Sequence, residues 1–493
     1  MIKSSHVAVF GTGSDVGKSV VATALCRSFA DRKIRVAPFK AQNMSNNSGI
    51  TPEGHEIGRA QIVQAEAARL QPHTDMNPIL LKPTGDRTSQ VVMNGLVHDD
   101  LSAMAYHGKK EYFFEQACAA FDRLAEKHGT IVIEGAGSCA EVNLMDSDIV
   151  NFRMAEYAKA DVVLVADIHK GGVFGQIVGT IECLPTVYRE MVKGFIINRF
   201  RGDPELFSEG VEWIERKTGK PVYGVLPWYT GFRVDAEDSV EIENCFSGGK
   251  TVGTLPAVAV IRLPHISNFT DVHALSEVKG MQAEFVDRSC DLSVFRAVII
   301  PGSKSTRSDL EWLKNTGLAE SIKRFAASGG HVLGICGGYQ MLGRCIFDPE
   351  GVEGEAGTSR GLGLLNIETK MKPEKTTTLS SFSWNGVSGE GYEIHMGETR
   401  CGEPTPFLMV HQPDGAGSAR GDGCVSADGR VAGTYIHGLF DTPAVLEKWL
   451  AGIGIDNVEI PAKDAGSKKD DNYIQLKKHF ESNVDMKKLL SSS

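Results

Sequence analysis

The chain has 493 residues, of which 42% are hydrophobic and 23% charged, and its formal net charge at pH 7 is −10. That length is too great for one hydrophobic core, so we expect two large domains or three smaller ones. No apolar run approaches the ~20 residues that cross a bilayer and no basic stripe is present, which argues against a membrane or nucleic acid as a partner.

Along the first half, short β-branched runs alternate with helical patterns, beginning with a strand at 6–10 and a helix at 18–32. This alternation predicts a doubly wound parallel sheet. The pattern lapses at 240–255, and a second α/β series follows. We therefore predict an α/β protein with one doubly wound domain at 1–245 and another at 255–450.

The remaining residues, 451–493, are predicted to form a charged linker at 461–472 and a short amphipathic helix. Leu476, Phe480 and Val484 recur every four residues, as on one face of a helix. A hairpin is expected across Asp428 and Gly429.

The start of the chain runs from a short polar lead straight into a strand, which leaves no room for a signal peptide, so we expect a cytoplasmic enzyme. The ten cysteines are scattered, with no C-x-x-C and no zinc-type pairing. Most are therefore expected to be small buried hydrophobes in a reducing compartment.

The segment GTGSDVGKSV, starting at residue 11, predicts a phosphate-binding loop between the first strand and the first helix. Gly17, Lys18 and Ser19 supply the end of the pattern G-x-x-x-x-G-K-[ST], while Thr12 replaces its first glycine. Backbone N–H groups and the helix N-terminus are expected to face phosphate oxygens. Lys18 would bridge the β- and γ-phosphates, and the Ser19 hydroxyl would reach Mg²⁺.

This loop is one residue longer than usual and resembles the dethiobiotin synthetase group of ATPases, whose pattern is G-T-x-x-x-V-G-K-[ST]. The resemblance implies that the γ-phosphoryl group of ATP activates a substrate carboxylate, which is otherwise a poor electrophile. It also implies that a residue in the segment INRFRGD lies near the adenine. The predicted ATP-binding residues are Thr12, Gly13, Val16, Gly17, Lys18, Ser19 and Asn198.

Further polar residues fall where strands of the first domain are expected to end, which is where open α/β sheets bind ligands. By the same resemblance, Glu134 is a Mg²⁺ ligand, with an exposed turn carboxylate as the alternative. Glu56, expected to open a helix, is a second metal ligand by resemblance, although helix N-termini favour acids anyway. Lys40 would neutralise charge between carboxylate and phosphate, or be a solvated lysine. Asp167 is placed in a substrate loop.

The segment GICGGYQMLG holds Cys336 in the frame G-x-C-x-G, between an apolar run and a helical pattern. This is the cysteine version of a nucleophile elbow, where the helix N-terminus favours the thiolate. Its partner should be a histidine from a later strand. His437, His395 and His411 are the candidates, and each taken alone is more often a structural residue.

The cysteine elbow and the late His437 together resemble class I glutamine amidotransferases. The resemblance implies that the thiolate attacks the glutamine side-chain amide and releases ammonia. Gly302 and Gly337 are the candidate oxyanion-hole donors. Many members of the class carry H-P-E, but here Gly438 and Leu439 follow the histidine. The third member of the site therefore stays open, with Asp441 as one candidate.

An acid-activating ATPase fused to an ammonia source predicts amide formation from an acyl phosphate, with a raised effective ammonia concentration. From about residue 5 to about residue 445, the order and spacing of the motifs resemble the cobyric acid synthase family. The resemblance implies glutamine-dependent amidation of the b, d, e and g carboxylates of a corrinoid, adenosylcobyrinic acid a,c-diamide, with ATP and Mg²⁺. The motifs are KAQNMSNNS, GHEIGRAQ, IEGAGS, DIHKGGVF, INRFRGD, PGSKST, GICGGYQMLG, GYEIHMG and YIHGLFD.

Two other readings stay open at this point. Cobyrinic acid a,c-diamide synthases share the two-domain plan but resemble this chain less in the first loop. A P-loop ATPase switch with a non-catalytic amidotransferase-like domain belongs to a different class, and such switches commonly carry a lysine where this chain has Gly13. The oligomeric state and the residues that contact the corrin ring are left undetermined.

Overall fold

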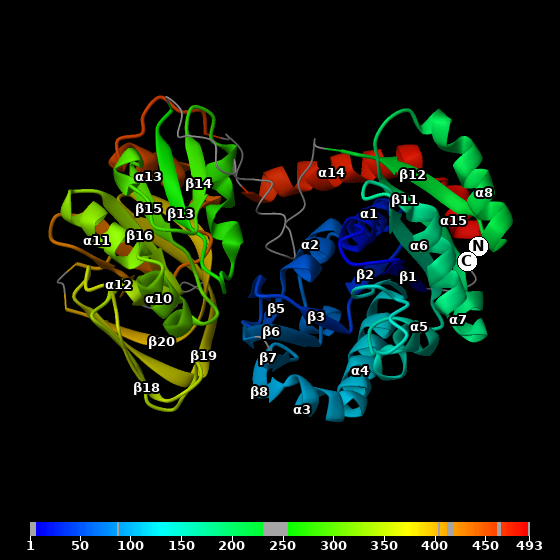
Figure 1. The fold of residues 1–493 in the computed structure, drawn as a ribbon, viewed down its shortest axis with the longest axis horizontal. Helices are drawn as coiled ribbons and strands as arrows, with labels where there is room; N and C mark the ends of the chain where they lie inside the picture. The colour runs from blue at the N-terminus through cyan, green and yellow to red at the C-terminus, as the bar shows by residue number, and fades with distance from the viewer. Residues whose placement is uncertain are drawn as a thin grey trace.

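A computed structural model describes residues 6–85, 88–229, 255–402, 405–411, 419–460 and 465–491. These residues form two lobes, and a C-terminal helix, α14, reaches from the second lobe back to the first (Figure 1). The domain boundary predicted at 240–255 lies, except for residue 255, outside the described residues.

The first lobe is built on a parallel sheet with the strand order β12-β11-β10-β1-β9-β2 among its described residues. Helices connect these strands, as the alternating pattern predicted. The bounds are β1 His6–Gly11, α1 Lys18–Asp31, β2 Val36–Phe39, α4 Lys110–His128, β9 Thr130–Glu134, α5 Phe152–Tyr157, β10 Asp161–Asp167, α6 Val173–Cys183, α7 Thr186–Met191, β11 Val192–Phe200, α8 Ser208–Thr218 and β12 Val222–Pro227.

Both faces of this sheet are buried, because the side chains of each strand alternate between two apolar layers. On β1, Ala8 and Phe10 pack in the layer that includes residues of α4, α5 and α6. Val7 and Val9 pack in the opposite layer with residues of α1. The phosphate-binding loop follows β1, so it starts from a strand that is packed between two apolar layers.

The segment between β2 and α4 forms smaller sheets on the side of the first lobe that faces the second (Figure 1). One has the strand order β3-β6-β7-β8, and the other pairs β4 with β5. The bounds are β3 Gln42–Met44, β4 Ser48–Ile50, β5 Glu56–Gly58, α2 Arg59–Ala67, β6 Ile79–Gly85, β7 Thr88–Met93, β8 Leu96–Ser102 and α3 Ala103–Gly108.

The second lobe contains a sheet with the order β14-β13-β15-β16-β24-β23, parallel except for its last pair. That last pair is the hairpin predicted across Asp428 and Gly429, which is confirmed. The bounds are β13 Ala257–Ile261, η5 Phe269–Glu277, β14 Gln282–Val286, β15 Ala297–Ile300, α10 Thr306–Asn315, α11 Leu318–Ala327, β16 His331–Ile335, α12 Gly337–Leu342, β23 Cys424–Val425, β24 Val431–Thr434 and α13 Pro443–Gly452.

A further sheet of the second lobe is dominated by a long antiparallel hairpin of β19 and β20. Its path is β18-β17-β19-β21-β22, with β20 paired to β19. The bounds are β17 Cys345–Asp348, β18 Gly357–Arg360, β19 Ile367–Trp384, β20 Val387–Cys401, β21 Leu408–His411 and β22 Arg420–Asp422. The hairpin carries residues of the second lobe to the first, where Thr377 donates a hydrogen bond to the carbonyl of Gly54.

The C-terminal helix α14, Ala465–Asn483, packs on α1 of the first lobe and is followed by α15, Met486–Ser491 (Figure 1). Leu476 and Phe480 are buried there, as their spacing predicted. The charged linker predicted at 461–472 is wrong from residue 465 onward, because the helix already begins there. Asp470, in this charged stretch, pairs with the buried Arg27 at 2.6 Å.

Two other expectations also need correction. The helix expected to open at Glu56 begins instead at Arg59, and Glu56 lies in the short strand β5. Cys401 and Cys424 form a disulfide, which the scattered cysteine spacing did not predict. Of the described free cysteines, Cys183 and Cys290 are exposed. No helix among the described residues combines the length and the apolar character that a membrane span requires.

Candidate active site

The phosphate-binding loop lies between β1 and α1 and is held from two sides. Gly17 has φ 96°, and a Cβ atom there would lie 2.1 Å from Nδ2 of Asn198, so only glycine fits. Asn198 donates from this nitrogen to the carbonyl of Val16 at 2.9 Å. At the start of the loop, the N–H of Thr12 donates to the carbonyl of Val165 at 3.0 Å.

Lys18 lies across this loop with its ammonium group directed at carbonyl oxygens. It donates to the carbonyl of Gly137 at 2.9 Å and to that of Gly13 at 3.3 Å. The side chain is 8% exposed. The cation is therefore already positioned within the loop, where an anionic group would meet it.

Glu134, at the end of β9, accepts hydrogen bonds from several polar side chains. Its Oε1 accepts from the Ser19 hydroxyl at 2.8 Å and from the Lys40 ammonium at 3.2 Å, while Oε2 accepts from Gln64. Burial acts to raise the pKa of Glu134, but Lys40 and these hydrogen bonds hold it below its usual value. Glu134 and Lys40 are 0% and 4% exposed, so neither is the exposed turn carboxylate or the solvated lysine considered as alternatives.

Asp167 and Asn198 are paired neighbours at the ends of β10 and β11. Asp167 is buried and forms an ion pair with Arg199 at 2.9 Å. The same guanidinium donates to the carbonyl of Asp15 in the phosphate-binding loop at 2.6 Å. Sequence reasoning missed Arg199, although it directly follows a predicted site residue. The substrate role of Asp167 and the adenine contact of Asn198 stay predictions.

Glu56 lies at the meeting of the two lobes rather than at a helix N-terminus. One carboxylate oxygen pairs with Lys82 at 2.6 Å, and the other pairs with Lys375 of β19 at 2.5 Å. Burial acts to raise the pKa of Glu56, but Lys375 and Lys82 together hold it below its usual value. The metal role stays a prediction, and an ion bound here would have to displace an ammonium group.

Cys336 occupies a sharp turn between β16 and α12. Its backbone has φ 50° and ψ −107°, a strained conformation for a residue other than glycine. The flanking glycines are required, because a Cβ atom at Gly338 would lie 1.9 Å from the carbonyl oxygen of Ile300. The Cys336 N–H donates to the carbonyl of Thr434 at 2.8 Å, which joins the elbow to β24.

His437 follows β24, and its interaction with Cys336 is one of the causes that raise its pKa. The Cys336 thiol donates a hydrogen bond to the carbonyl of Ile394 at 3.5 Å. Nδ1 of His437 lies 2.7 Å from Oδ2 of Asp271 in η5, whose other oxygen accepts from the N–H of Gly438 at 2.8 Å. Burial acts to lower the pKa of His437, but Asp271 and then Cys336 raise it to about 10. Nucleophile, base and orienting acid of a catalytic triad have this arrangement, and these roles of the three residues stay predictions.

Asp271 is the acid that faces His437, so it becomes the candidate for the third member that the sequence left open. It lies 166 positions before His437, and no local pattern marks it. Asp441, the earlier candidate, lies in the short turn after Gly438 and does not hold Nδ1, which faces Asp271.

The predicted oxyanion-hole glycines both border the triad. A Cβ atom at Gly302 would lie 3.4 Å from Cε1 of His437, and one at Gly337 would lie 2.9 Å from the N–H nitrogen of Ser303. The two glycines thus approach each other beside Cys336. Their role as donors to an oxyanion stays a prediction.

The rival histidines have other partners. His395 stacks on Tyr435 with ring centroids 3.8 Å apart, and its Nδ1 faces the carbonyl of Gly397. His411 faces the hydroxyl of Ser383 at 3.1 Å. Their contacts leave His437 as the favoured partner of Cys336, and that pairing stays a prediction.

Comparison with known proteins gives the same division of the chain. Residues 7–240 match the family model described as the CobQ/CobB/MinD/ParA nucleotide binding domain. Residues 257–445 match the model described as the CobB/CobQ-like glutamine amidotransferase domain. Each model covers one lobe and the site that lies in it.

Curated relatives match over both lobes. A cobyric acid synthase of Pelodictyon phaeoclathratiforme is 48% identical, and the match covers 100% of this chain and 99% of the relative. The chain belongs to the cobyric acid synthase family. A second family member, from Chlorobaculum tepidum, is 48% identical over 99% of this chain and 97% of its own length. A third, from Salmonella typhimurium, is 48% identical over 90% and 88%.

Membership of the cobyric acid synthase family confirms several predictions from the sequence. The chain is an α/β enzyme, an amidoligase, with an ATP-using nucleotide-binding domain before a glutamine amidotransferase domain. The alternative of an ATPase switch with a non-catalytic second domain is therefore not supported.

Proposed function

We propose that this enzyme amidates the b, d, e and g carboxylates of adenosylcobyrinic acid a,c-diamide, a corrinoid, with ATP and L-glutamine. The observation that carries the proposal is the pair of sites in one chain: the Cys336–His437–Asp271 triad and the loop around Lys18. One site suits release of ammonia from an amide, and the other suits phosphorylation of an acid.

In the amidotransferase lobe, Nε2 of His437 would hold the Cys336 proton in an imidazolium–thiolate pair, and the sulfur would attack the carbonyl carbon of the glutamine side chain. N–H groups at Gly302 and Gly337 would hold the resulting oxyanion. Return of the proton to the leaving nitrogen releases ammonia and leaves a γ-glutamyl thioester. Water then cleaves the thioester to glutamate and free thiol.

In the nucleotide-binding lobe, a substrate carboxylate oxygen would attack the γ-phosphorus of ATP, giving an acyl phosphate and ADP. Lys18 would neutralise charge on the phosphates, and the buried Lys40 would do so where the two anions meet. Ammonia then attacks the acyl carbon. The bond between that carbon and the phosphate oxygen breaks, and inorganic phosphate leaves. Each cycle yields one amide.

The residues near Lys18 fit a bound Mg²⁺. This ion prefers hard oxygen ligands and is commonly held by one or two side chains plus substrate phosphates. The Ser19 hydroxyl and the Glu134 carboxylate offer such oxygens 2.8 Å apart. Among the described residues no group of three His, Cys, Asp or Glu side chains could hold a metal. When bound, the ion would offset phosphate charge; Ser19 and Glu134 would hold it.

The test is a reaction of the enzyme with adenosylcobyrinic acid a,c-diamide, L-glutamine and MgATP, followed by mass spectrometry of the products. Each amidation replaces a hydroxyl by an amino group, so the mass change counts the steps. We expect a final product with four new amides. A corrinoid recovered unchanged while ATP is hydrolysed would contradict the proposal. Turnover of cobyrinic acid at its a and c carboxylates instead would indicate the diamide synthase.

A further inference from the structure

Strand β20 runs beside the Cys336 thiol, and its two faces look in different directions. The thiol donates to the carbonyl of Ile394 at 3.5 Å. Because side chains alternate along a strand, Met396 shares the face of Ile394, and Glu393 lies on the opposite face. The sulfur of Met396 accepts from Gln90 of the first lobe at 3.7 Å. The face of Glu393 therefore looks away from the first lobe.

This second face of β20 carries charges of both signs. Glu393 is 1% exposed and accepts from the guanidinium of Arg420 in β22 and from the Ser380 hydroxyl at 3.2 Å. Its other oxygen lies 3.4 Å from Nε2 of His395. The Arg420 side chain is 53% exposed. The ion pair therefore runs from the protein surface to a buried carboxylate next to the strand that passes the thiol.

A second buried carboxylate, Asp422, is tied to the cysteine elbow. It is 5% exposed and accepts from the Thr434 hydroxyl, while the carbonyl of Thr434 accepts from the N–H of Cys336 at 2.8 Å. Burial raises the pKa of Asp422, and the negative charge of Glu393 raises it further. The two carboxylates share the guanidinium of Arg420, which lies 4.0 Å from Asp422. A further positive group would stabilise both.

An amide oxygen without a donor lies on the same face. Gln340 follows Cys336 by one helical turn and is 2% exposed. Its Nε2 donates to the Tyr435 hydroxyl at 3.1 Å, but its Oε1 has no hydrogen-bond partner among the residues that the structure describes. A Cβ atom at Gly397, which would project to the face of Glu393, would lie 2.3 Å from Nε2. A donor from a ligand would satisfy this buried oxygen.

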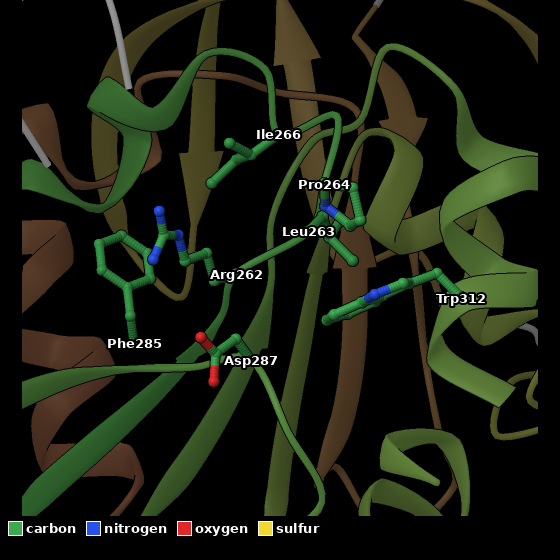
Figure 2. A pocket seen from close by; sticks show the side chains of 7 residues that line it. All are labelled: Arg262, Leu263, Pro264, Ile266, Phe285, Asp287 and Trp312. Atoms are coloured by element: carbon green, nitrogen blue, oxygen red, sulfur yellow. The ribbon is translucent and has the colours of Figure 1, made fainter. Parts of the chain in front are cut away.

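The α-carbon of a glutamine bound at Cys336 falls within reach of this face. Three carbon–carbon bonds of about 1.5 Å each separate it from the side-chain amide carbon. The pocket in Figure 2 also offers an acid and an arginine, Asp287 and Arg262. It lies at the ends of β14 and β13, whereas Cys336 follows β16. At about 4.8 Å per strand, these ends are about 10 Å or more from the elbow, beyond the reach of that side chain.

We propose that Glu393 and Asp422 bind the α-ammonium group of L-glutamine, with Gln340 accepting a third hydrogen bond. Arg420 binds the α-carboxylate, because a guanidinium matches a carboxylate with two parallel hydrogen bonds. The proposal rests on the function proposed above, in which L-glutamine is the nitrogen donor. The site would select a free amino acid and reject amides that lack either charge, since they leave buried polar groups unpaired.

The test measures ammonia release from three amides in the presence of MgATP and the corrinoid acid. They are L-glutamine, glutaramate, which lacks the α-ammonium group, and 4-aminobutanamide, which lacks the α-carboxylate. We expect the wild-type kcat/KM to be at least about 10²-fold higher for L-glutamine than for either analogue. Equal values for the three amides would overturn the proposal.

Glu393→Gln keeps the shape of the side chain but removes its charge. Its kcat/KM for L-glutamine should fall about tenfold to a hundredfold, mainly through KM, the effect of losing one charged hydrogen bond. Its value for glutaramate should stay within about threefold of the wild type, because that amide has no ammonium group to lose. Equal losses for L-glutamine and glutaramate would indicate a purely structural role and overturn the assignment.

Arg420→Ala tests the other half of the site. It should weaken L-glutamine and glutaramate, which both carry the carboxylate, and spare 4-aminobutanamide. Arg420→Lys should restore part of the loss, because the positive charge returns. Arg262→Ala, in the pocket of Figure 2, is the matched control and should leave the three values unchanged. A loss of selectivity in the Arg262 variant instead would place the head group in that pocket and overturn the proposal.

Amidation with ammonium chloride separates this proposal from the function proposed above. It does not use the glutamine site, so it should stay within about twofold of the wild type in each variant. Its failure in the wild type would contradict the proposed function alone. Lost amide selectivity in a wild-type enzyme that still amidates with ammonium chloride would overturn the head-group site alone.

Discussion

Nδ1 of His437 lies 2.7 Å from Oδ2 of Asp271, and both side chains are 1% exposed. Because water does not screen this pair, the carboxylate fixes the imidazole's tautomer and orientation and stabilises its protonated form. The contact makes Asp271 the proposed third member of the triad, and the behaviour of Asp271 variants is therefore the most direct check of the glutaminase site.

Asp271→Asn is expected to lower glutamine-dependent amidation by about 10²- to 10⁴-fold, because the neutral amide no longer holds the imidazole in its reactive form. Amidation with ammonium chloride should remain near the wild-type rate. Steady-state assays with the two nitrogen sources measure both effects. Asp441→Asn is the matched control and should reduce glutamine use only weakly; the reverse ranking would remove Asp271 from the triad.

Cys336→Ala should abolish release of glutamate from glutamine, because the proposed thioester forms on the sulfur of this residue. The variant should still form amide from supplied ammonia, since the phosphate-binding loop lies in the other lobe. Cys183→Ala, at an exposed cysteine, should behave as the wild type. Loss of both activities in a correctly folded Cys336 variant would argue against separate sites.

Lys18→Ala should stop amidation with either nitrogen source, because the buried ammonium group meets the phosphates in both cases. We expect a loss of at least about 10²-fold, the usual scale for removing one such electrostatic contact. Lys127→Ala, at an exposed position, is the control. Product formation by the Lys18 variant at the wild-type rate would refute the phosphate role.

Glutamine hydrolysis should persist through neutral pH and fall as pH rises through about 10. The pKa of His437 is raised from 6.5 to about 10, chiefly by Asp271 against the effect of burial, so the imidazolium is lost only there. The stability that this pair contributes is complete below about pH 6.5 and is lost over the same rise. In Asp271→Asn the alkaline limb should move to lower pH, and an unmoved limb would mean that another group sets it.

Phe480→Ala should destabilise the first lobe by about 3–5 kcal/mol, the usual cost of removing a buried phenyl group. Phe480 is 1% exposed and packs with residues of α1 and β12. Thermal or urea unfolding measures the loss. Lys478→Ala, exposed on the same helix, should change stability by less than about 0.5 kcal/mol. Equal stabilities for the two variants would show that α14 adds little to this core.

The features predicted correctly from sequence are those whose determinants are contiguous. The phosphate-binding loop and the cysteine elbow are each a strand, a turn and a helix, and Gly17 and Gly338 are required by close contacts that the sequence pattern encodes. Errors occurred where the tertiary environment overrides local preference. Helix α2 was expected to start at Glu56 but starts at Arg59. Glu56 instead lies in a strand paired with β4, and its carboxylate forms an ion pair with Lys375 of the other lobe.

The sequence by itself determined the α/β class, the cysteine elbow, the loop between β1 and α1 and the reaction class, because the motifs behind each lie within short stretches of chain. Only the tertiary structure decided that Asp271 faces His437, and that Asn268 lies between His437 and Ser48. Those contacts join segments 166, 169 and 220 positions apart. Such pairings depend on how separate elements pack, and no spacing rule along the chain records that packing.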